Sequence, residues 1–270
     1  MRNLGVLAAL CLVACAPQRP EPGPGDPGPD ADPGDPGDPG DPPVQTFVYA
    51  HTSSDLYRVD PDSLAVQLIG PFSFTTGSDQ ITDIAINKAG TMIGISFNSV
   101  YRIDPSNAAA TRLSDGLSGL FNGLSFMPAD QIGQTGDDIL VATRNADGVV
   151  WRVDPMTGGT TMIGNMGAFS SSGDCVSVAQ LGTLQTADNG ISADRLVRLA
   201  PNTFQAQTVG TDIGFSDIWG IAFWKDKVFG FTNGGEFITI DPVTGVGTLV
   251  QGNGPSWWGA AVTTLAPVVL

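Results

Sequence analysis

The sequence predicts an all-β fold, a five-bladed β-propeller with four-stranded antiparallel blades, and three observations carry this prediction. The 35 glycines and 20 prolines, beside only 14% charged and 8% aromatic residues, are typical of a turn-rich β protein. One strand-turn-strand motif returns five times, at intervals of roughly 45 residues. A spare strand near the C-terminus, Gly259 to Val262, would complete the first unit. We therefore expect the N- and C-terminal strands to share one closing blade.

Each repeat carries the same marker, an aliphatic or aromatic pair usually followed by Arg, an aliphatic residue, Asp and Pro. A turn and a second alternating stretch follow the marker, which indicates a hairpin, and another short strand precedes it. Four copies have a further strand ahead of these, expected to be the innermost strand of a blade. The five markers are Leu56 to Pro61, Val100 to Pro105, Val150 to Pro155, Leu196 to Pro201 and Phe237 to Pro242.

Two further regularities of the repeats indicate scaffold rather than function. The third residue of every expected innermost strand is Ala or Ser, small enough for strands that converge on a narrow axis. The marker also places Arg and Asp two residues apart, hence on one face of a strand. We expect these Arg and Asp side chains to form ion pairs and the Asp to cap the turn before Pro.

The first residues predict export and a lipid anchor. An apolar run over residues 4–13 is too short to span a membrane as a stable helix, so residues 1–14 are interpreted as a signal peptide. The run ends in Leu12-Val13-Ala14-Cys15, which resembles the bacterial lipobox. In lipoproteins that cysteine receives a diacylglyceryl group, with fatty acyl chains such as palmitate, and becomes the mature N-terminus. An ordinary secretory peptide or an uncleaved anchor is the alternative.

The resemblance also implies where the anchored protein is located in the cell. Lipid chains on Cys15 would hold the protein on the extracytoplasmic side of a membrane without a spanning helix. In lipoproteins an aspartate after the cysteine commonly retains the protein in the inner membrane, and in this chain that residue is Ala16. In a Gram-negative source this implies the outer membrane.

Residues 15–43 differ in composition from the rest of the chain. They hold 11 of the 20 prolines together with many acidic residues and glycines, and no such segment can build a core. We expect a disordered, partly polyproline tether. Residues 44–270 then hold the propeller, in which Cys175 is the one remaining cysteine, so no intramolecular disulfide is expected.

The repeats resemble those of bacterial extracytoplasmic propellers built on units of the type L-Y-x-I-D-P-x-T-G, many of them lipoproteins of unassigned function. Asp154 to Gly158 and Asp241 to Gly245 match that unit best, whereas Ala200 departs from it. The resemblance covers roughly residues 46–265. It implies a scaffold and no particular activity.

Composition and motifs exclude several function classes. With 12 basic against 27 acidic residues and a net charge of -15, the chain has no basic face for nucleic acid. Zincin, P-loop and paired Cys-x-x-Cys motifs are missing, and the single histidine, His51, excludes sites that need several. We expect a monomeric domain with no metal site and no cofactor, calcium being the one ion that the Asp-rich loops leave open.

Positions that deviate from the repeat are the better candidates for function. Thr82 and four other residues directly precede the expected innermost strands and would surround the mouth of the axis. A rim that mixes indole faces with Asp and Asn is typical of carbohydrate sites, although packing between blades is the alternative for the tryptophans. The predicted ligand-binding residues are Asn122, Asp174, Trp219, Trp257 and Trp258.

The favoured function is therefore a membrane-tethered extracytoplasmic binding or interaction module, with a glycan or a protein as ligand. The alternative is a hydrolase or lyase with an axial pocket, possible only if a base and acids meet there. Its catalytic residues would be Asp83, Asp174 and His51, with calcium as a conceivable cofactor. That interpretation requires the three side chains to converge at one cavity, and His51 has a second interpretation as a surface neighbour of the closing blade.

Overall fold

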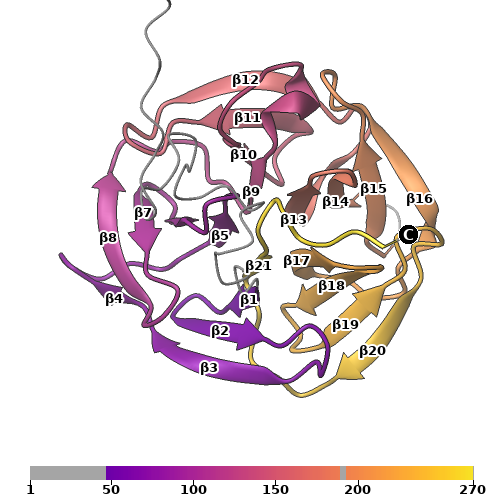
Figure 1. Cartoon of the computed structure of the whole chain (residues 1–270), viewed down its shortest axis with the longest axis horizontal. Helices are drawn as coiled ribbons and strands as arrows, with labels where there is room; N and C mark the ends of the chain where they lie inside the picture. Colours follow the sequence, from indigo (N-terminus) through magenta and orange to yellow (C-terminus); the bar gives the residue numbers. More distant parts are fainter. Residues whose placement is uncertain (1–46, 189–192, 270) are drawn as a thin grey trace, which may run out of the picture. The chain divides into compact units, whose positions relative to one another are not determined.

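The computed structural model describes residues 47–188 and 193–269. The signal peptide, the lipidated Cys15 and the tether predicted for residues 1–43 lie outside these ranges. The described residues belong to the compact unit that spans residues 45–270. Its sheets surround one axis as a five-bladed β-propeller, which confirms the predicted fold (Figure 1). No helix in the described ranges is both long and apolar enough to cross a membrane.

Each blade contains four antiparallel strands that follow one another from the axis outward. Blade 1 consists of β21 (Gly259–Ala261), β1 (Val48–His51), β2 (Asp55–Val59) and β3 (Val66–Pro71). Blade 2 consists of β5 (Asp83–Ile86), β6 (Met92–Ile95), β7 (Val100–Ile103) and β8 (Ala109–Ser114). Blade 3 consists of β9 (Gly123–Met127), β10 (Ile139–Thr143), β11 (Val149–Val153) and β12 (Thr160–Asn165).

Blade 4 consists of β13 (Ser170–Val178), β14 (Gly182–Asp188), β15 (Arg195–Leu199) and β16 (Ala206–Asp212). Blade 5 consists of β17 (Ile218–Trp224), β18 (Lys227–Thr232), β19 (Phe237–Ile240) and β20 (Gly247–Gln251). Two short elements are additions to the predicted pattern. Strand β4 (Ser73–Phe74) pairs in parallel with β8, and η1 (Ala129–Ile132) is a 3-10 turn after β9.

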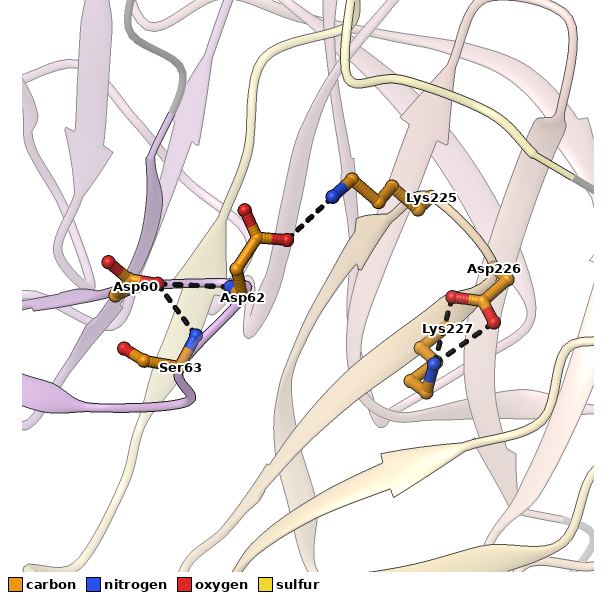
Figure 2. Close-up of polar contacts among 6 residues, drawn as sticks. All are labelled: Asp60, Asp62, Ser63, Lys225, Asp226 and Lys227. Atoms are coloured by element: carbon orange, nitrogen blue, oxygen red, sulfur yellow. Dashed lines mark hydrogen bonds and ion pairs between the residues drawn. The ribbon is translucent and has the colours of Figure 1, made fainter.

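Blade 1 closes the ring with strands from both ends of the described chain. Strand β1 pairs with β2 on one side and with β21 on the other, with Tyr49 opposite Ala261, as the spare C-terminal strand predicts. Figure 1 shows the yellow β21 beside the indigo β1 near the axis. At the surface, Lys225 Nζ of blade 5 lies 2.6 Å from Asp62 Oδ1 of blade 1 (Figure 2). A surface ion pair therefore also joins blades 1 and 5.

The segment after β21, residues 262–269, crosses the end of the axis at which the innermost strands finish, and we call it the strap. Thr263 and Thr264 in the strap are buried. Each of blades 2 to 5 exchanges a hydrogen bond with it. These bonds run from Thr263 Oγ1 to the Asn87 carbonyl (3.1 Å), from Thr264 Oγ1 to Asp138 Oδ2 (2.6 Å), from the Ala179 amide to the Thr264 carbonyl (2.8 Å) and from the Lys225 amide to the Pro267 carbonyl (2.8 Å).

The innermost strands pack closely because their side chains are small. The expected Ala or Ser at the third position is buried in every blade, and Ser125 Oγ accepts a hydrogen bond from the Ser177 amide of the next blade (3.2 Å). A side chain at Gly220 would overlap the backbone of Gly259 in blade 1. The apolar core lies mainly between neighbouring blades.

The Asp of each Asp-Pro turn caps that turn, as expected. Asp60 Oδ1 accepts hydrogen bonds from the amides of Asp62 (3.0 Å) and Ser63 (2.8 Å), and these bonds lower the pKa of the Asp60 carboxyl (Figure 2). The expected ion pairs of the marker are not found in the described residues. Arg58 faces Gln67 across the β2–β3 pair, and its guanidinium donates to Gln67 Oε1 (2.7 Å) instead of to an Asp carboxylate.

Candidate functional site

A cavity of about 710 Å³ opens at the end of the axis at which the innermost strands begin, opposite the strap, and we call it the axial pocket. Blades 1, 2, 3 and 5 contribute to its wall. Three of the predicted ligand-binding residues, Asn122, Trp219 and Trp258, line it. Its full lining is Thr82, Phe97, Gly119, Leu120, Phe121, Asn122, Arg144, Asn145, Ala146, Trp219 and Trp258.

Apolar and aromatic side chains dominate this wall. Trp219 and Trp258, from blades 5 and 1, meet edge to face with ring centroids 6.0 Å apart and an interplanar angle of 80°. On the blade 2 and 3 side, Phe97 is 47% and Leu120 is 68% exposed. Folding leaves this apolar surface in water, and such patches are typical of places where a protein binds something else.

The polar part of the wall comes from blade 3. The side-chain amide of Asn122 donates to the side-chain oxygen of Asn145. Arg144 donates to Asp147 Oδ2 through Nε (3.0 Å) and Nη2 (2.7 Å), and its guanidinium carbon lies 5.2 Å from the centre of the Trp151 ring. Arg144 is the one charged side chain in the described lining, so the pocket holds no carboxylate.

The structure places the other two predicted ligand-binding residues away from the pocket. Trp257 is 2% exposed and packs edge to face against Tyr57 and Phe231, at centroid distances of 5.0 and 5.4 Å. It belongs to the hydrophobic core, so the packing alternative holds for this residue. Asp174 is fully buried and does not line the pocket.

Sequence reasoning missed Phe97, Leu120, Phe121, Arg144 and Asn145. They lie in the β6–β7, β8–β9 and β10–β11 connections, where the repeats have no common length. One signal was present in the sequence. Residues 114–123 place two leucines and a phenylalanine in a loop otherwise made of Gly, Ser, Asp and Asn. Leu117 and Phe121 are buried in the core, whereas Leu120 is 68% exposed at the pocket.

Three buried titratable side chains, His51, Asp83 and Asp174, lie close to one another, and we call them the axial cluster. All three are 0% exposed, and His51 Nε2 lies 3.8 Å from Asp83 Oδ1. Gly259 leaves room for this contact, because a methyl group there would overlap both atoms. The interpretation of His51 as a surface residue is therefore wrong, since the side chain points inward from the end of β1.

The protonation of the axial cluster follows from burial. Burial lowers the pKa of His51 to about 4, so the ring is neutral at pH 7, and its Nδ1–H donates to the Thr52 carbonyl (2.7 Å). Burial also raises the pKa of Asp83 and of Asp174, and the negative charge of Asp174 raises that of Asp83 further. The two carboxyl groups are close enough to share a hydrogen bond. The contact between the two raises the pKa of Asp83 and lowers that of Asp174, so Asp83 takes up a proton more readily.

Backbone amides favour the charged form of Asp174 more than that of Asp83. Asp174 accepts from the amides of Cys175 (2.6 Å) and Ile221 (2.9 Å), and such N–H donors favour the anionic form. Asp83 accepts from one amide, that of Ile84 (2.8 Å).

The axial cluster does not open into the axial pocket. None of its three side chains lines the cavity, although Thr82 of the lining is next to Asp83 in sequence. The enzyme interpretation requires the three side chains to meet at one cavity, and none of them lines the axial pocket. Within the described ranges, no three His, Cys, Asp or Glu side chains are arranged to hold a metal ion.

Comparisons with known proteins place the fold. No protein-family model and no curated protein matches the chain. A solved chain from work on the de novo evolutionary emergence of a symmetrical protein is 14% identical, with a TM-score of 0.52 over 83% of this chain and 100% of that one. A chain of the nidogen/laminin complex is 8% identical, with a TM-score of 0.53 over 80% and 98%. TolB from Acinetobacter baumannii is 16% identical, with a TM-score of 0.44 over 76% and 52%. At these identities the first two show a shared β-propeller fold.

Proposed function

We propose that the protein is a lipid-anchored, extracytoplasmic binding module that takes its ligand in the axial pocket. The observation that carries this proposal is the exposed apolar wall, in which Phe97 and Leu120 face solvent beside two indole rings. Concave, largely apolar sites with a few polar groups are the usual form of a ligand site. The β-propeller fold is consistent with a binding or interaction role.

The chemistry of the wall supports a glycan as the first candidate ligand. The apolar face of a sugar ring stacks on an indole such as that of Trp219 or Trp258. Hydroxyl groups of the same sugar would find Thr82, Asn122 and Asn145 in the lining. An apolar segment of a partner protein is the second candidate, favoured by the exposure of Leu120 at the mouth.

The anchor belongs to the same proposal. Acyl chains on Cys15 would hold the protein on the membrane, in a Gram-negative source the outer one, and residues 16–43 would carry the propeller away from the lipid. In cells fed labelled palmitate, the wild-type protein is expected to take up label and to sediment with membranes. Cys15→Ser is expected to lose the label. Label that persists in Cys15→Ser would contradict the anchor.

Thermal unfolding with a panel of cell-wall and plant oligosaccharides tests the ligand site. A sugar present at one hundred times its Kd stabilises the fold by about 2.7 kcal/mol, and each kcal/mol raises the Tm of a domain this size by roughly 2 to 4 °C. Trp258→Ala is expected to abolish this rise. Trp224→Ala is the matched control, because Trp224 packs on the core outside the pocket.

The outcomes separate the candidate ligands. A rise that Trp224→Ala keeps and Trp258→Ala loses supports the glycan. If no sugar shifts the Tm, but peptides selected from a random library bind the wild type and not Trp258→Ala, the ligand is a protein segment. If Trp258→Ala keeps every ligand of the wild type, the axial pocket is not the site.

The hydrolase or lyase remains the second candidate function, favoured by the convergence of the axial cluster. It predicts turnover of a chromogenic glycoside or ester that Asp83→Asn and Asp174→Asn both abolish. If such turnover depends on calcium, EDTA abolishes it and added calcium restores it. Turnover that both variants retain would refute a catalytic role for the cluster.

A further inference from the structure

The polar side of the axial pocket has an unused hydrogen-bonding edge on Arg144. A guanidinium carries five N–H donors in one planar fork. Asp147 Oδ2 takes two of them, the one on Nε (3.0 Å) and one on Nη2 (2.7 Å). The other three, two on Nη1 and one on Nη2, have no partner among the described residues. The Nη1–Nη2 edge of Arg144 is therefore left for a ligand.

The guanidinium is already held in place before any ligand binds. Its carbon lies 5.2 Å from the centre of the Trp151 ring. Asp147 is fixed in turn, because its second oxygen, Oδ1, accepts a hydrogen bond from the Val149 amide (3.1 Å). The Arg144 side chain is 27% exposed, so a ligand can reach it. A planar fork that is fixed beforehand loses little entropy when it binds.

Asn145, the next residue, adds donors to the same part of the wall. It is exposed, it lines the pocket, and its side-chain oxygen accepts a hydrogen bond from Asn122. The side-chain NH2 group of Asn145 has no partner among the described residues. The groups left unpaired at Arg144 and Asn145 are thus all N–H donors. Such a corner suits an acceptor that carries negative charge.

A carboxylate fits this corner best. Its two oxygens lie in one plane and match the guanidinium fork, and hydrogen bonds between charged groups are about twice as strong as neutral ones. Arg144 is the one charged side chain in the described lining, and its single positive charge matches a monoanion rather than a phosphate dianion. Asp147 occupies the other edge of the guanidinium. Salt screens more distant acidic residues over about 8 Å at physiological ionic strength.

The same pocket offers a surface for the apolar face of a sugar. Trp219 and Trp258 line it, and their rings meet edge to face. An indole takes an apolar ring face. A uronic acid combines such a face with a carboxylate on one ring, so it matches both parts of the wall. A neutral sugar would leave the free edge of Arg144 without a charged partner.

We propose that the ligand of the axial pocket is an acidic glycan, a uronic-acid oligosaccharide whose carboxylate pairs with the Nη1–Nη2 edge of Arg144 while a sugar ring stacks on the indole pair. This rests on the proposed function, because it names the class of glycan for the same pocket. Arg144 is the specificity-determining residue. Asp147 and Trp151 are positioning residues, which hold the guanidinium.

Isothermal titration calorimetry of the purified protein with matched oligosaccharides tests the inference. The acids are trimers of galacturonate and of glucuronate, and each is paired with its methyl ester, which keeps the rings and hydroxyl groups and removes the charge. For the wild type, the Kd of an acid is expected to be roughly tenfold to a hundredfold lower than that of its ester, as hydrogen bonds to a charged group imply. Arg144→Gln is expected to bind both members of a pair with the wild-type Kd of the ester.

Two control variants separate the edge of Arg144 from net charge and from misfolding. Arg102→Gln removes the same charge from an exposed position of β7 outside the lining, so it is expected to keep the full preference for the acid. Arg144→Lys keeps the charge but replaces the fork by a point charge, so it is expected to keep only part of the preference. Circular dichroism of each variant shows whether the sheets remain.

Three results would overturn the inference. The first is a wild type that binds neither acid, or binds acid and ester equally. The second is a preference for the acid that Arg144→Gln keeps in full. The third is phenylacetate binding as tightly as the acidic trimers, because the carboxylate would then be recognised without the sugar.

The proposed function fails in a different way. If Trp258→Ala binds every acid and ester with the wild-type Kd, the axial pocket is not the site. If the wild type binds acid and ester equally and Trp258→Ala loses both, the pocket stands as a glycan site. The role of Arg144 is then refuted alone.

Discussion

Mild acid is expected to destabilise the folded protein through His51, the only histidine of the chain. Its ring is fully buried, and Nε2 has no hydrogen-bond partner among the described residues. Burial lowers the pKa of His51 from 6.5 to about 4. The unfolded chain therefore binds the proton first. Stability from this group is complete above pH 6.5 and is lost as the pH falls toward 4.

The size of the effect follows from the two pKa values. For a pKa of about 4 in the folded state and 6.5 in the unfolded state, linkage gives a loss of about 2 kcal/mol between pH 7 and pH 5. Small domains are stable by only about 5 to 15 kcal/mol, so this is a substantial share. Asp83 and Asp174 act with the opposite sign, because their pKa values are raised and the folded state takes up the proton first.

Urea unfolding of the wild type and of His51→Asn, followed by tryptophan fluorescence at pH 7, 6 and 5, separates the two contributions. Asparagine keeps a donor for the Thr52 carbonyl and does not titrate, while both proteins share the carboxyl groups. The unfolding free energy of the wild type minus that of the variant is expected to fall by about 2 kcal/mol from pH 7 to pH 5. A difference that stays constant over this range would refute a buried, neutral His51.

Three further predictions concern the ring. Deleting residues 257–270 removes β21 and the strap, so circular dichroism is expected to show no cooperative thermal transition, and a normal transition would contradict the closing role of β21. Gly259→Ala places a methyl group against Asp83 and His51 and is expected to lower the unfolding free energy by about 1 to 3 kcal/mol in urea, with an unchanged value counting against the close contact. Lys225→Ala breaks an ion pair with Asp62 in which both side chains are exposed. The same urea assay is therefore expected to show an unfolding free energy lower by less than about 1 kcal/mol. A larger loss would mean that the pair is stronger than its exposure implies.

The scaffold could be predicted from the sequence because each blade repeats the same local rules. Alternation with period two, Asp before Pro at the turn and small residues on the innermost strand each recur five times or nearly so. Their spacing predicts the C-terminal strand at Gly259 to Val262, and β21 spans Gly259–Ala261. The spare strand at Gly259 then closes the ring.

Two of the predicted ligand-binding residues, Asp174 and Trp257, lie outside the axial pocket for reasons that spacing cannot reveal. The β13–β14 pairing shifts register between Ser171 and Cys175, and this irregularity turns Asp174 inward instead of to the rim. Trp257 and Trp258 are adjacent, so alternation sends them to opposite sides of the chain. One indole reaches the pocket and the other reaches the core.

The other residues of the pocket wall could not be predicted by comparing the repeats with one another. Phe97, Leu120 and Arg144 lie in connections whose lengths differ from blade to blade, so comparing one repeat with another gives these residues no equivalent. The axial cluster was named from the sequence as three separate deviations. That its members are buried close to one another depends on how the strands pack, which a single sequence does not display.

The strap gives the ring a property that open repeat proteins do not have. In a solenoid each repeat contacts only its neighbours, so terminal repeats can fray while the others persist. In this propeller the pairing of β1 with β21 joins residues about 200 positions apart, and the strap bonds to the four remaining blades. The contacts that close the ring are therefore non-local, and such contacts make folding slow. No blade is terminal, and none can leave without breaking bonds that belong to the others. The propeller is therefore expected to melt in one transition, with all five repeats sharing a single free energy of unfolding.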